Sequence, residues 1–243
     1  SITGHYPMDF KARNWYKHVS RHYQGMIFSI RQDQLCEIVP EGQEIGKITA
    51  ECAKETGLPE GIPVYACGSD KSCETLGNGV IDSSVAAVSL GTACTIETTI
   101  TKFLKHDTFF PSYPSCIPGY YNLDVQVYRG YWMLNWFLKE FGATKVNDLV
   151  IDDVKADEFN KHLDEIPAGS DGLILQPYWG SLLERPIVKG AVVGFTDVTT
   201  RMHFYKAIIE GINYDLMYGL YTMSKRGKQV IREIYVGGGG SQS

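Results

Sequence analysis

The chain has no apolar run that approaches the ~20 residues needed to span a bilayer as a helix. Its first five residues lack the basic and then apolar pattern of a signal peptide. No cluster of Lys or Arg stands out, and the formal net charge is −5, so the chain lacks the electrostatic footprint of a nucleic-acid-binding protein. The sequence therefore predicts a cytoplasmic protein that has neither a membrane nor a nucleic acid as its partner.

Metal-binding and disulfide patterns are also missing. The six cysteines are scattered and contain no Cys-x-x-Cys pair, which favours reduced thiols over a disulfide framework. Among the six histidines, His18 and His22 are four residues apart but have no matching third ligand, so we predict no protein metal site. The cysteines are Cys36, Cys52, Cys67, Cys73, Cys94 and Cys116.

What the chain does contain is typical of a globular protein with a substantial core. Its 243 residues are 44% hydrophobic and 21% charged. Apolar spacing and turn residues predict strands interleaved with helices, which indicates an α/β fold. We expect helices over 14–24, 45–56, 70–77, 129–141 and 199–224 with helix-prone stretches within 145–164, strands over 63–67, 85–90, 93–100, 119–127, 172–176, 190–195 and 231–236, and a proline-rich loop over 109–119.

Gly91-Thr92 lies between an apolar run, 85–90, and a β-prone run, 95–100. Two strands joined by so short a turn predict a tight hairpin. Such a turn exposes backbone N–H groups and one hydroxyl, which suits a polyphosphate, and glycine allows close approach and a positive φ. The alternative is a hairpin in which Gly-Thr merely suits the turn.

Asp70 follows an apolar strand, 63–67, and two small residues, Gly68-Ser69. A short carboxylate in this place can project into a cleft and accept the proton of a substrate hydroxyl. The alternative is an N-cap in which Asp70 bonds the amide of Ser72 or Cys73 at the start of the helix.

Four glycines, Gly237 to Gly240, follow the last strand of the chain. They would let a strand-to-helix turn pass close beneath a ligand. Because Ser241 follows, the stretch also has the composition of an engineered flexible linker, but the native-looking strand before it favours a natural motif. It is not a Gly-x-Gly-x-x-Gly fingerprint after a first strand, so a Rossmann fold is disfavoured.

In this order the segments resemble the FGGY family of carbohydrate kinases, and the resemblance covers nearly the whole chain. The family's Gly-x-Asp is matched by Gly68-Ser69-Asp70, its phosphate hairpin by Ser89-Leu90-Gly91-Thr92, and its adenosine motif by Gly238-Gly239-Gly240. A further family stretch is matched from Pro177-Tyr178-Trp179-Gly180 through Gly190 to Thr196.

The resemblance implies a ribonuclease H-like fold of the actin-like ATPase and sugar kinase type, with parts of two domains flanking a cleft. Residues 1–80 would end the N-terminal domain, and 81–243 would form most of the C-terminal, nucleotide-binding domain, with a hinge near Gly77-Asn78-Gly79. Family members are about twice this length and open with an Asp-x-Gly-Thr motif that is absent here. We therefore expect both ends to be cut and the isolated piece to be inactive.

The resemblance also implies an activity, the ATP- and Mg²⁺-dependent phosphorylation of a sugar or polyol. Asp70 would be the catalytic base, and Asp70 and Lys71 would face the substrate, although the position of Lys71 is more often a neutral amide in the family. A side chain that simply extends into solvent is the alternative for Lys71, and a surface or capping amide is the alternative for Asn135. The residues expected to contact ATP are Gly91, Thr92, Asn135, Gly238, Gly239, Gly240 and Ser243.

A homodimer is a usual arrangement in the family and is expected here. A different class of function is a non-catalytic nucleotide-binding module of the actin-like fold, which would need the hairpin but no base. Asp70 discriminates between the two functions, because only the kinase requires its carboxylate.

Overall fold

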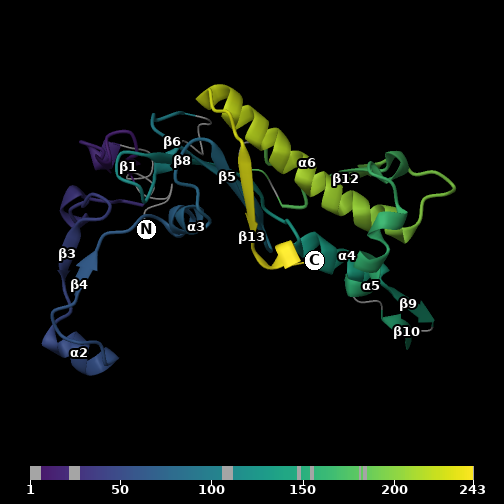
Figure 1. Ribbon diagram of the computed structural model, residues 1–243, viewed down its shortest axis with the longest axis horizontal. Coiled ribbons are helices and arrows are strands. Elements are labelled where there is room, and N and C mark those ends of the chain that lie inside the picture. Colours follow the sequence, from purple (N-terminus) through teal and green to yellow (C-terminus); the bar gives the residue numbers. More distant parts are fainter. Residues whose placement is uncertain are drawn as a thin grey trace. The chain divides into compact units, whose positions relative to one another are not determined.

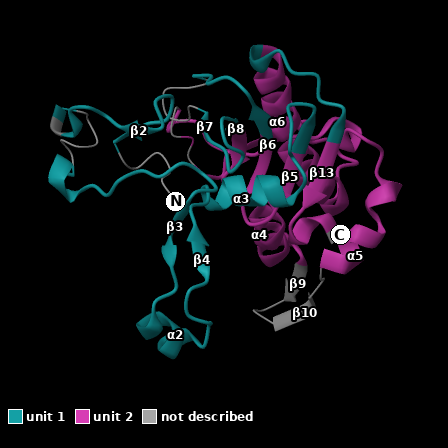
Figure 2. Cartoon of the chain, turned by 60° about the vertical axis from the view of Figure 1, so that its left-hand side comes forward, with its two compact units in different colours: residues 1–86, 98–123, 226–233 teal, residues 87–97, 124–225, 234–243 magenta. Residues whose placement is uncertain are grey.

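The computed structural model describes residues 7–21, 28–105, 112–146, 149–153, 156–180, 182 and 185–242. The chain divides into two compact units, coloured separately in Figure 2. Unit 1 comprises Ser1–Ala86, Thr98–Leu123 and Arg226–Glu233, and unit 2 comprises Ala87–Glu97, Asp124–Lys225 and Ile234–Ser243. Each unit is described by itself below.

The described residues include a sheet of five strands in the order β13-β5-β6-β8-β7. Figure 1 labels β5, β6, β8 and β13. Its strands are β5 (Val85–Leu90), β6 (Cys94–Ile100), β7 (Tyr113–Pro114), β8 (Tyr121–Val127) and β13 (Glu233–Gly237). β6 is buried along its whole length and β5 at all but one residue, as expected for apolar and β-branched strands in the interior of a sheet. β7 pairs antiparallel with β8 and places a short strand in the predicted proline-rich loop.

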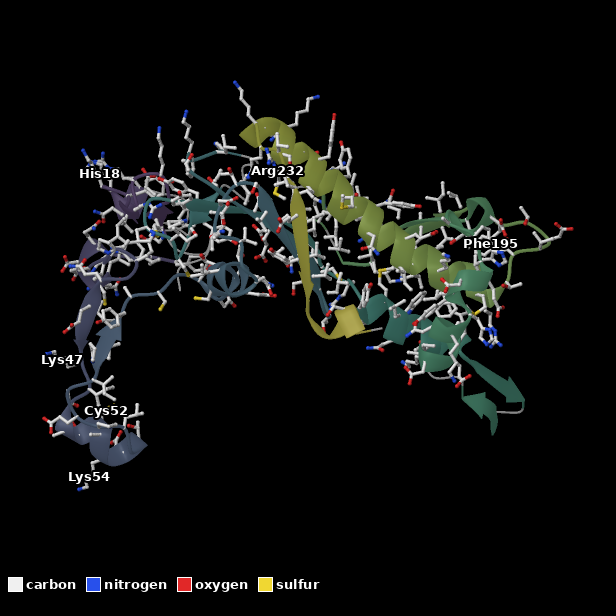
Figure 3. All side chains as sticks on the ribbon, in the orientation of Figure 1. His18, Lys47, Cys52, Lys54, Phe195 and Arg232 are labelled. Atoms are coloured by element: carbon white, nitrogen blue, oxygen red, sulfur yellow. The ribbon has the colours of Figure 1, made fainter. Side chains whose placement is uncertain are left out.

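The described part of unit 1 also contains two short antiparallel pairs and the helices α2 and α3. β1 (Met8–Asp9) pairs with β2 (Asn14–Trp15), and β3 (Glu44–Lys47) pairs with β4 (Pro63–Tyr65). The short 3₁₀ turns are η1 (Val19–Arg21) and η2 (Gln32–Gln34). Helix α2 (Ala50–Thr56) has no buried residue, and Figure 3 labels two of its side chains, Cys52 and Lys54. Helix α3 (Asp70–Gly77) has the predicted bounds.

Two predicted helices of this unit are wrong in part. Residues 14–15 form a strand and 19–21 a 3₁₀ turn instead of the helix over 14–24, whose residues 22–24 lie outside the described residues. The helix over 45–56 begins only at Ala50, because residues 44–47 pair with β4 and the Thr49 hydroxyl caps the helix by accepting a bond from Cys52 N. Pairing with a distant strand overrides a short helical pattern.

Unit 2 is organised around long helix α6 (Arg201–Gly227), of which it holds all but the last two residues. Gly219 of α6 lies against Val125 of β8, so this helix packs on the sheet (Figure 1). The other elements are α4 (Trp132–Phe141), β9 (Ala143–Val146), β10 (Leu149–Asp153), α5 (Ala156–Lys161), η3 (Leu163–Glu165), η4 (Ser170–Gly172), β11 (Ile174–Gln176), β12 (Ala191–Val193) and η5 (Gly239–Gln242). The β9–β10 hairpin replaces the first part of the helix-prone region expected within 145–164.

Rings from three helices form an aromatic core in unit 2. Phe137 of α4 lies 5.6 Å from Phe159 of α5 and 5.6 Å from Tyr205 of α6, measured between ring centroids. Burial raises the pKa of Tyr205 to about 12, so its hydroxyl stays protonated and donates to Asn160 Oδ1 at 3.1 Å. The helix predicted over 129–141 begins at Trp132, and Phe137 on its apolar face packs into this core. The helices that the structure describes are all too short or too polar to span a bilayer.

Candidate functional site

The β5–β6 connection is three residues long, so these neighbouring strands form the predicted tight hairpin. The N–H of Gly91 donates to Ala93 O at 3.1 Å within the turn, and φ at Gly91 is not positive. Two expectations are therefore wrong: Gly91 does not offer a free N–H, and it does not need a left-handed conformation. Thr92 forms the exposed tip, and among the described residues its N–H and hydroxyl have no hydrogen-bond partner.

The start of α4 holds this hairpin in place. Tyr131 N, just before the helix, donates to Gly91 O at 3.0 Å. Gly130 packs so closely that a Cβ there would lie 2.3 Å from Cys94 Sγ and 2.6 Å from Cys94 N. Burial raises the pKa of the Cys94 thiol, which acts as a small apolar side chain beneath the turn. The sequence had not identified Gly130 and Tyr131 as residues of the site.

The four-glycine turn packs against the end of β5 and against Tyr131. Gly238 has φ +87°, and a Cβ there would lie 2.6 Å from Leu90 O, the last residue of β5. A Cβ at Gly240 would lie 2.3 Å from Tyr131 Cδ2. Gly239 is different, because a Cβ there would meet nothing within 4 Å. Both the N–H and the hydroxyl of Ser241 bond to Gly238 O, so this stretch is a folded 3₁₀ turn with the close contacts of a packed element and not a flexible linker.

Unit 2 therefore brings together two segments that are almost 150 residues apart in the sequence, and Tyr131 contacts both. Asn135 is exposed on α4, four residues after Tyr131 and hence on the same side of the helix. Ser243, also predicted to contact a nucleotide, lies outside the described residues. The N–H and hydroxyl of Thr92 and the exposed amide of Asn135 belong to the same unit as the glycine turn, and all three groups can bond to a phosphate or another polar ligand.

Asp70 lies in unit 1, as the first residue of α3. The cap of this helix is Ser69, whose Oγ accepts a hydrogen bond from Ser72 N at 3.2 Å. The predicted alternative, in which Asp70 bonds Ser72 or Cys73 as the N-cap, is therefore wrong. The carboxylate is exposed, with Oδ1 accepting only from Lys71 N at 2.8 Å among the described hydrogen bonds. Lys71 Nζ pairs with Glu74 Oε2 at 2.7 Å on the same helix instead of extending freely into solvent.

A buried polar network fixes the start of α3. Ser72 Oγ donates to Asn122 Oδ1 at 2.8 Å and accepts from Cys116 N at 2.7 Å. Asn122 Nδ2 donates to Thr99 Oγ1 at 3.0 Å, and Asn122 and Ser72 are completely buried. These bonds hold the first turn of α3 to β6, to β8 and to the segment after β7. The backbone that carries the neighbouring Asp70 is therefore held in place.

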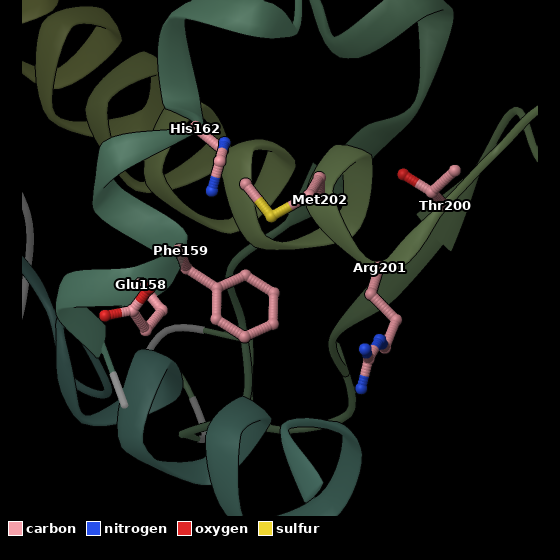
Figure 4. A pocket seen from close by; sticks show the side chains of 6 residues that line it. All are labelled: Glu158, Phe159, His162, Thr200, Arg201 and Met202. Carbon is pink, nitrogen blue, oxygen red and sulfur yellow. The ribbon is translucent and has the colours of Figure 1, made fainter. Parts of the chain in front are cut away.

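A separate pocket of about 430 Å³ lies between α5 and the start of α6 (Figure 4). It contains none of the residues expected from the sequence. Its floor includes Phe159, and Arg201 at its edge donates to Phe141 O at 3.1 Å. The lining residues are Glu158, Phe159, His162, Thr200, Arg201 and Met202. In the part of the chain that the structure describes, no group of three His, Cys, Asp or Glu side chains could hold a metal ion.

Comparison with protein families gives two matches that together cover most of the chain. The model of the FGGY family of carbohydrate kinases, N-terminal domain, matches residues 2–77. The model of the FGGY family of carbohydrate kinases, C-terminal domain, matches residues 86–243.

Individual proteins agree with these matches. The chain is 26% identical over 247 residues to the uncharacterized sugar kinase YgcE of Escherichia coli (strain K12), covering 99% of this chain and 49% of the relative. It is 28% identical to the xylulose kinase of Bacillus subtilis (strain 168), covering 84% of this chain and 40% of that protein. The structure of ligand-bound xylulose kinase from Lactobacillus acidophilus superposes with a TM-score of 0.78 at 25% identity, covering 98% of this chain and 46% of that one. The chain thus spans less than half the length of these relatives.

Proposed function

The chain belongs to the FGGY family of carbohydrate kinases, and we propose that it supplies the catalytic base and most of the nucleotide site of an enzyme that transfers the γ-phosphoryl group of ATP to a hydroxyl of a sugar or polyol. Its fold is the predicted α/β, ribonuclease H-like fold of the sugar kinases. The observation that carries the proposal is the meeting of the Gly91-Thr92 hairpin with the Gly238–Gly240 turn at Tyr131. A nucleotide needs both of these features: a surface that binds its phosphates, and a close-packed turn against which its flat base can lie.

Asp70 is proposed as the base. In phosphoryl transfer the protein mainly positions the reactants and stabilises charge, while a carboxylate orients the attacking hydroxyl and accepts its proton. An exposed carboxylate at the start of a helix whose cap is another residue, Ser69, is free for this role. Lys71 is proposed to contact the substrate, for which it must exchange its partner Glu74 for a hydroxyl or carboxylate of the sugar.

Thr92 is proposed to bind the β- and γ-phosphates through its N–H and hydroxyl, while Gly91 lets the phosphates come near the backbone. Gly238, Gly239 and Gly240 would pass beneath the adenosine, with Asn135 and Ser243 beside it. The open space at Gly239 fits this proposal, because the packing of the chain does not itself require glycine there. Magnesium is proposed as a companion of ATP that is held mainly by the phosphates, because Mg²⁺ keeps several waters and needs few protein ligands, and the described residues contain no cluster of metal-ligating side chains. When bound, it neutralises phosphate charge.

We also propose the domain border between residues 80 and 81, with a hinge near Gly77-Asn78-Gly79, because the two family matches leave 78–85 between them. A cytoplasmic location, a homodimer, and the absence of nucleic-acid and membrane partners are part of the same proposal, and they rest on the resemblance and on the composition of the chain.

A coupled assay of ADP release by the intact protein tests this function. ATP and Mg²⁺ are supplied with pentoses, hexoses, polyols, ketoses or aldonates in turn, and the phosphorylated product is identified by mass spectrometry. We expect ADP release that depends on one of these classes and produces its phosphate ester. Nucleotide binding with no acceptor-dependent ADP release from any class would instead favour the non-catalytic nucleotide-binding module.

A further inference from the structure

Two thiols of unit 1 lie next to each other at the start of helix α3, the helix that Asp70 begins. Cys73 Sγ and Cys116 Sγ are 3.5 Å apart, although the residues are 43 positions apart in the sequence. Both cysteines are free; Cys73 is exposed and Cys116 is partly exposed. A disulfide requires the sulfur atoms to approach to about 2.05 Å, a distance that small side-chain rotations can supply when two thiols already touch.

Both sulfur atoms lie against Gly68, the first residue of the Gly68-Ser69-Asp70 turn. Cys73 lies in the first turn of α3, three residues after Asp70, and its Sγ is 3.9 Å from Gly68 O. Cys116 Sγ occupies the space above Gly68, where an added Cβ would lie 2.6 Å from the sulfur. The backbone of Cys116 is itself bonded to Ser72 Oγ. A movement of the two sulfur atoms therefore changes the packing of the turn that carries the Asp70 carboxylate.

We propose that Cys73 and Cys116 form an oxidative modification site that takes up one disulfide from a small disulfide oxidant and thereby reversibly blocks phosphoryl transfer. The blocking part of this inference rests on the proposed function, whereas the disulfide itself does not. Joining the sulfur atoms moves both of them from their places against Gly68, so the Gly68-Ser69-Asp70 turn repacks and Asp70 shifts. A displacement of about 1 Å at a reacting group can reduce a rate by about 100-fold.

The chemistry is two successive thiol–disulfide exchanges. The thiolate of the more exposed Cys73 attacks the external disulfide, forming a mixed disulfide and releasing one external thiol. The thiolate of Cys116 then attacks the sulfur of Cys73, forming the Cys73–Cys116 bond and releasing the second external thiol. In total the two protein thiols lose two protons and two electrons, and the external disulfide takes them up and is reduced to two thiols.

The hydrogen bond with Cys116, together with burial, raises the pKa of the Cys73 thiol. Since the thiolate is the nucleophile, exchange is expected to need minutes to hours. This sets the duration of the experiment.

The test uses the intact protein treated with oxidised glutathione for several hours, then alkylated, digested with trypsin and examined by mass spectrometry without reduction. Trypsin places Cys73 in the peptide 72–102, Cys116 in 106–129 and Cys67 in 55–71, so the three thiols are separated. Sugar-dependent ADP release is measured before oxidation, after it, and after adding dithiothreitol. The variants are Cys73→Ser and Cys116→Ser, with Cys67→Ser as the matched control for an exposed thiol close to the same turn.

We expect peptides 72–102 and 106–129 to be linked and activity to fall at least tenfold, with recovery on reduction. Cys67→Ser should behave like the wild type, whereas Cys73→Ser and Cys116→Ser should lose both the link and the sensitivity. Because 72–102 also contains Cys94, persistence of the link in Cys73→Ser would overturn the assignment. Separate glutathione adducts, or a link to 55–71, would also overturn it.

A linked pair with unchanged activity would overturn the blocking role. An intact, reduced protein without kinase activity would contradict the proposed function, while the linked peptides would still support the modification site. If Cys73→Ser does not fold, Cys116→Ser gives the same comparison from the other sulfur.

Discussion

Adding one methyl group at each of two adjacent glycines separates a structural role of the four-glycine turn from a ligand-binding role. At Gly239 a Cβ meets nothing within 4 Å and φ is not positive. Gly239→Ala should therefore leave the free energy of unfolding unchanged or raise it by about 0.4–1 kcal/mol, because alanine reduces the entropy of the unfolded chain. At Gly240 the Cβ would lie 2.3 Å from Tyr131 Cδ2. Gly240→Ala should lower the free energy of unfolding by about 1–3 kcal/mol through overpacking.

The effect of Gly239→Ala on nucleotide binding should differ from its effect on stability. If the turn passes beneath the adenosine, the methyl group at Gly239 occupies space that the ligand needs. We expect the Kd for a non-hydrolysable ATP analogue to rise at least tenfold in Gly239→Ala, which corresponds to about 1.4 kcal/mol. Gly46→Ala is the matched control, because Gly46 also has open space and no positive φ and belongs to strand β3.

Isothermal titration calorimetry gives the Kd, and urea unfolding gives the stability of the same samples. The reasoning would be refuted if Gly239→Ala bound the analogue as tightly as the wild type does. It would also be refuted if Gly46→Ala weakened binding to the same extent, since the effect would then not belong to the turn.

Three further changes test other parts of the account. Thr92→Val, which removes the exposed hydroxyl at the hairpin tip, should raise the KM for ATP about tenfold or more without changing the melting temperature; an unchanged KM would argue against phosphate binding there. Asn122→Ala should lower the free energy of unfolding by about 2–3 kcal/mol in urea titrations, because both buried partners of its amide lose a bond; a loss below about 0.5 kcal/mol would contradict the network. Asp215 accepts a hydrogen bond from Tyr178 Oη at 3.0 Å, and burial raises the pKa of its carboxyl above the ordinary 3.8. As pH rises, this carboxyl therefore ionises first in the unfolded state, and the free energy of unfolding falls until pH has passed the folded-state pKa. Asp215→Asn should therefore be more stable than the wild type at pH 7 but not below the ordinary carboxyl pKa, and equal differences at both pH values would disprove this.

Elements with strong local patterns could be predicted from the sequence. Helix α3, the β5–β6 hairpin and the long helix α6 lie where they were expected, because their apolar spacing and turn residues act over short distances. Regions whose residues fit both a helix and a strand could not be predicted in this way. Ile45 and Ile48 fit a helix, yet the chain at 44–47 pairs with β4, a partner that local spacing does not reveal.

The same limit applies to the site. The residue types and order predicted the Gly91-Thr92 hairpin and the exposed Asp70, but not what holds them. Ser69 caps α3 in place of Asp70, and Tyr131 joins the hairpin to the glycine turn. These contacts depend on segments distant in the sequence, as does the proximity of Cys73 to Cys116.

The most direct test of the central claim compares Asp70→Asn with Ser69→Ala in the intact enzyme. Asp70 is exposed and does not cap its helix, so Asp70→Asn should keep wild-type stability and the wild-type Kd for ATP while kcat falls by about 10²–10⁴. Ser69→Ala removes the cap, so it should lose about 1 kcal/mol of stability and retain most of its kcat. Turnover of Asp70→Asn at the wild-type rate would contradict the assignment of this carboxylate as the catalytic base.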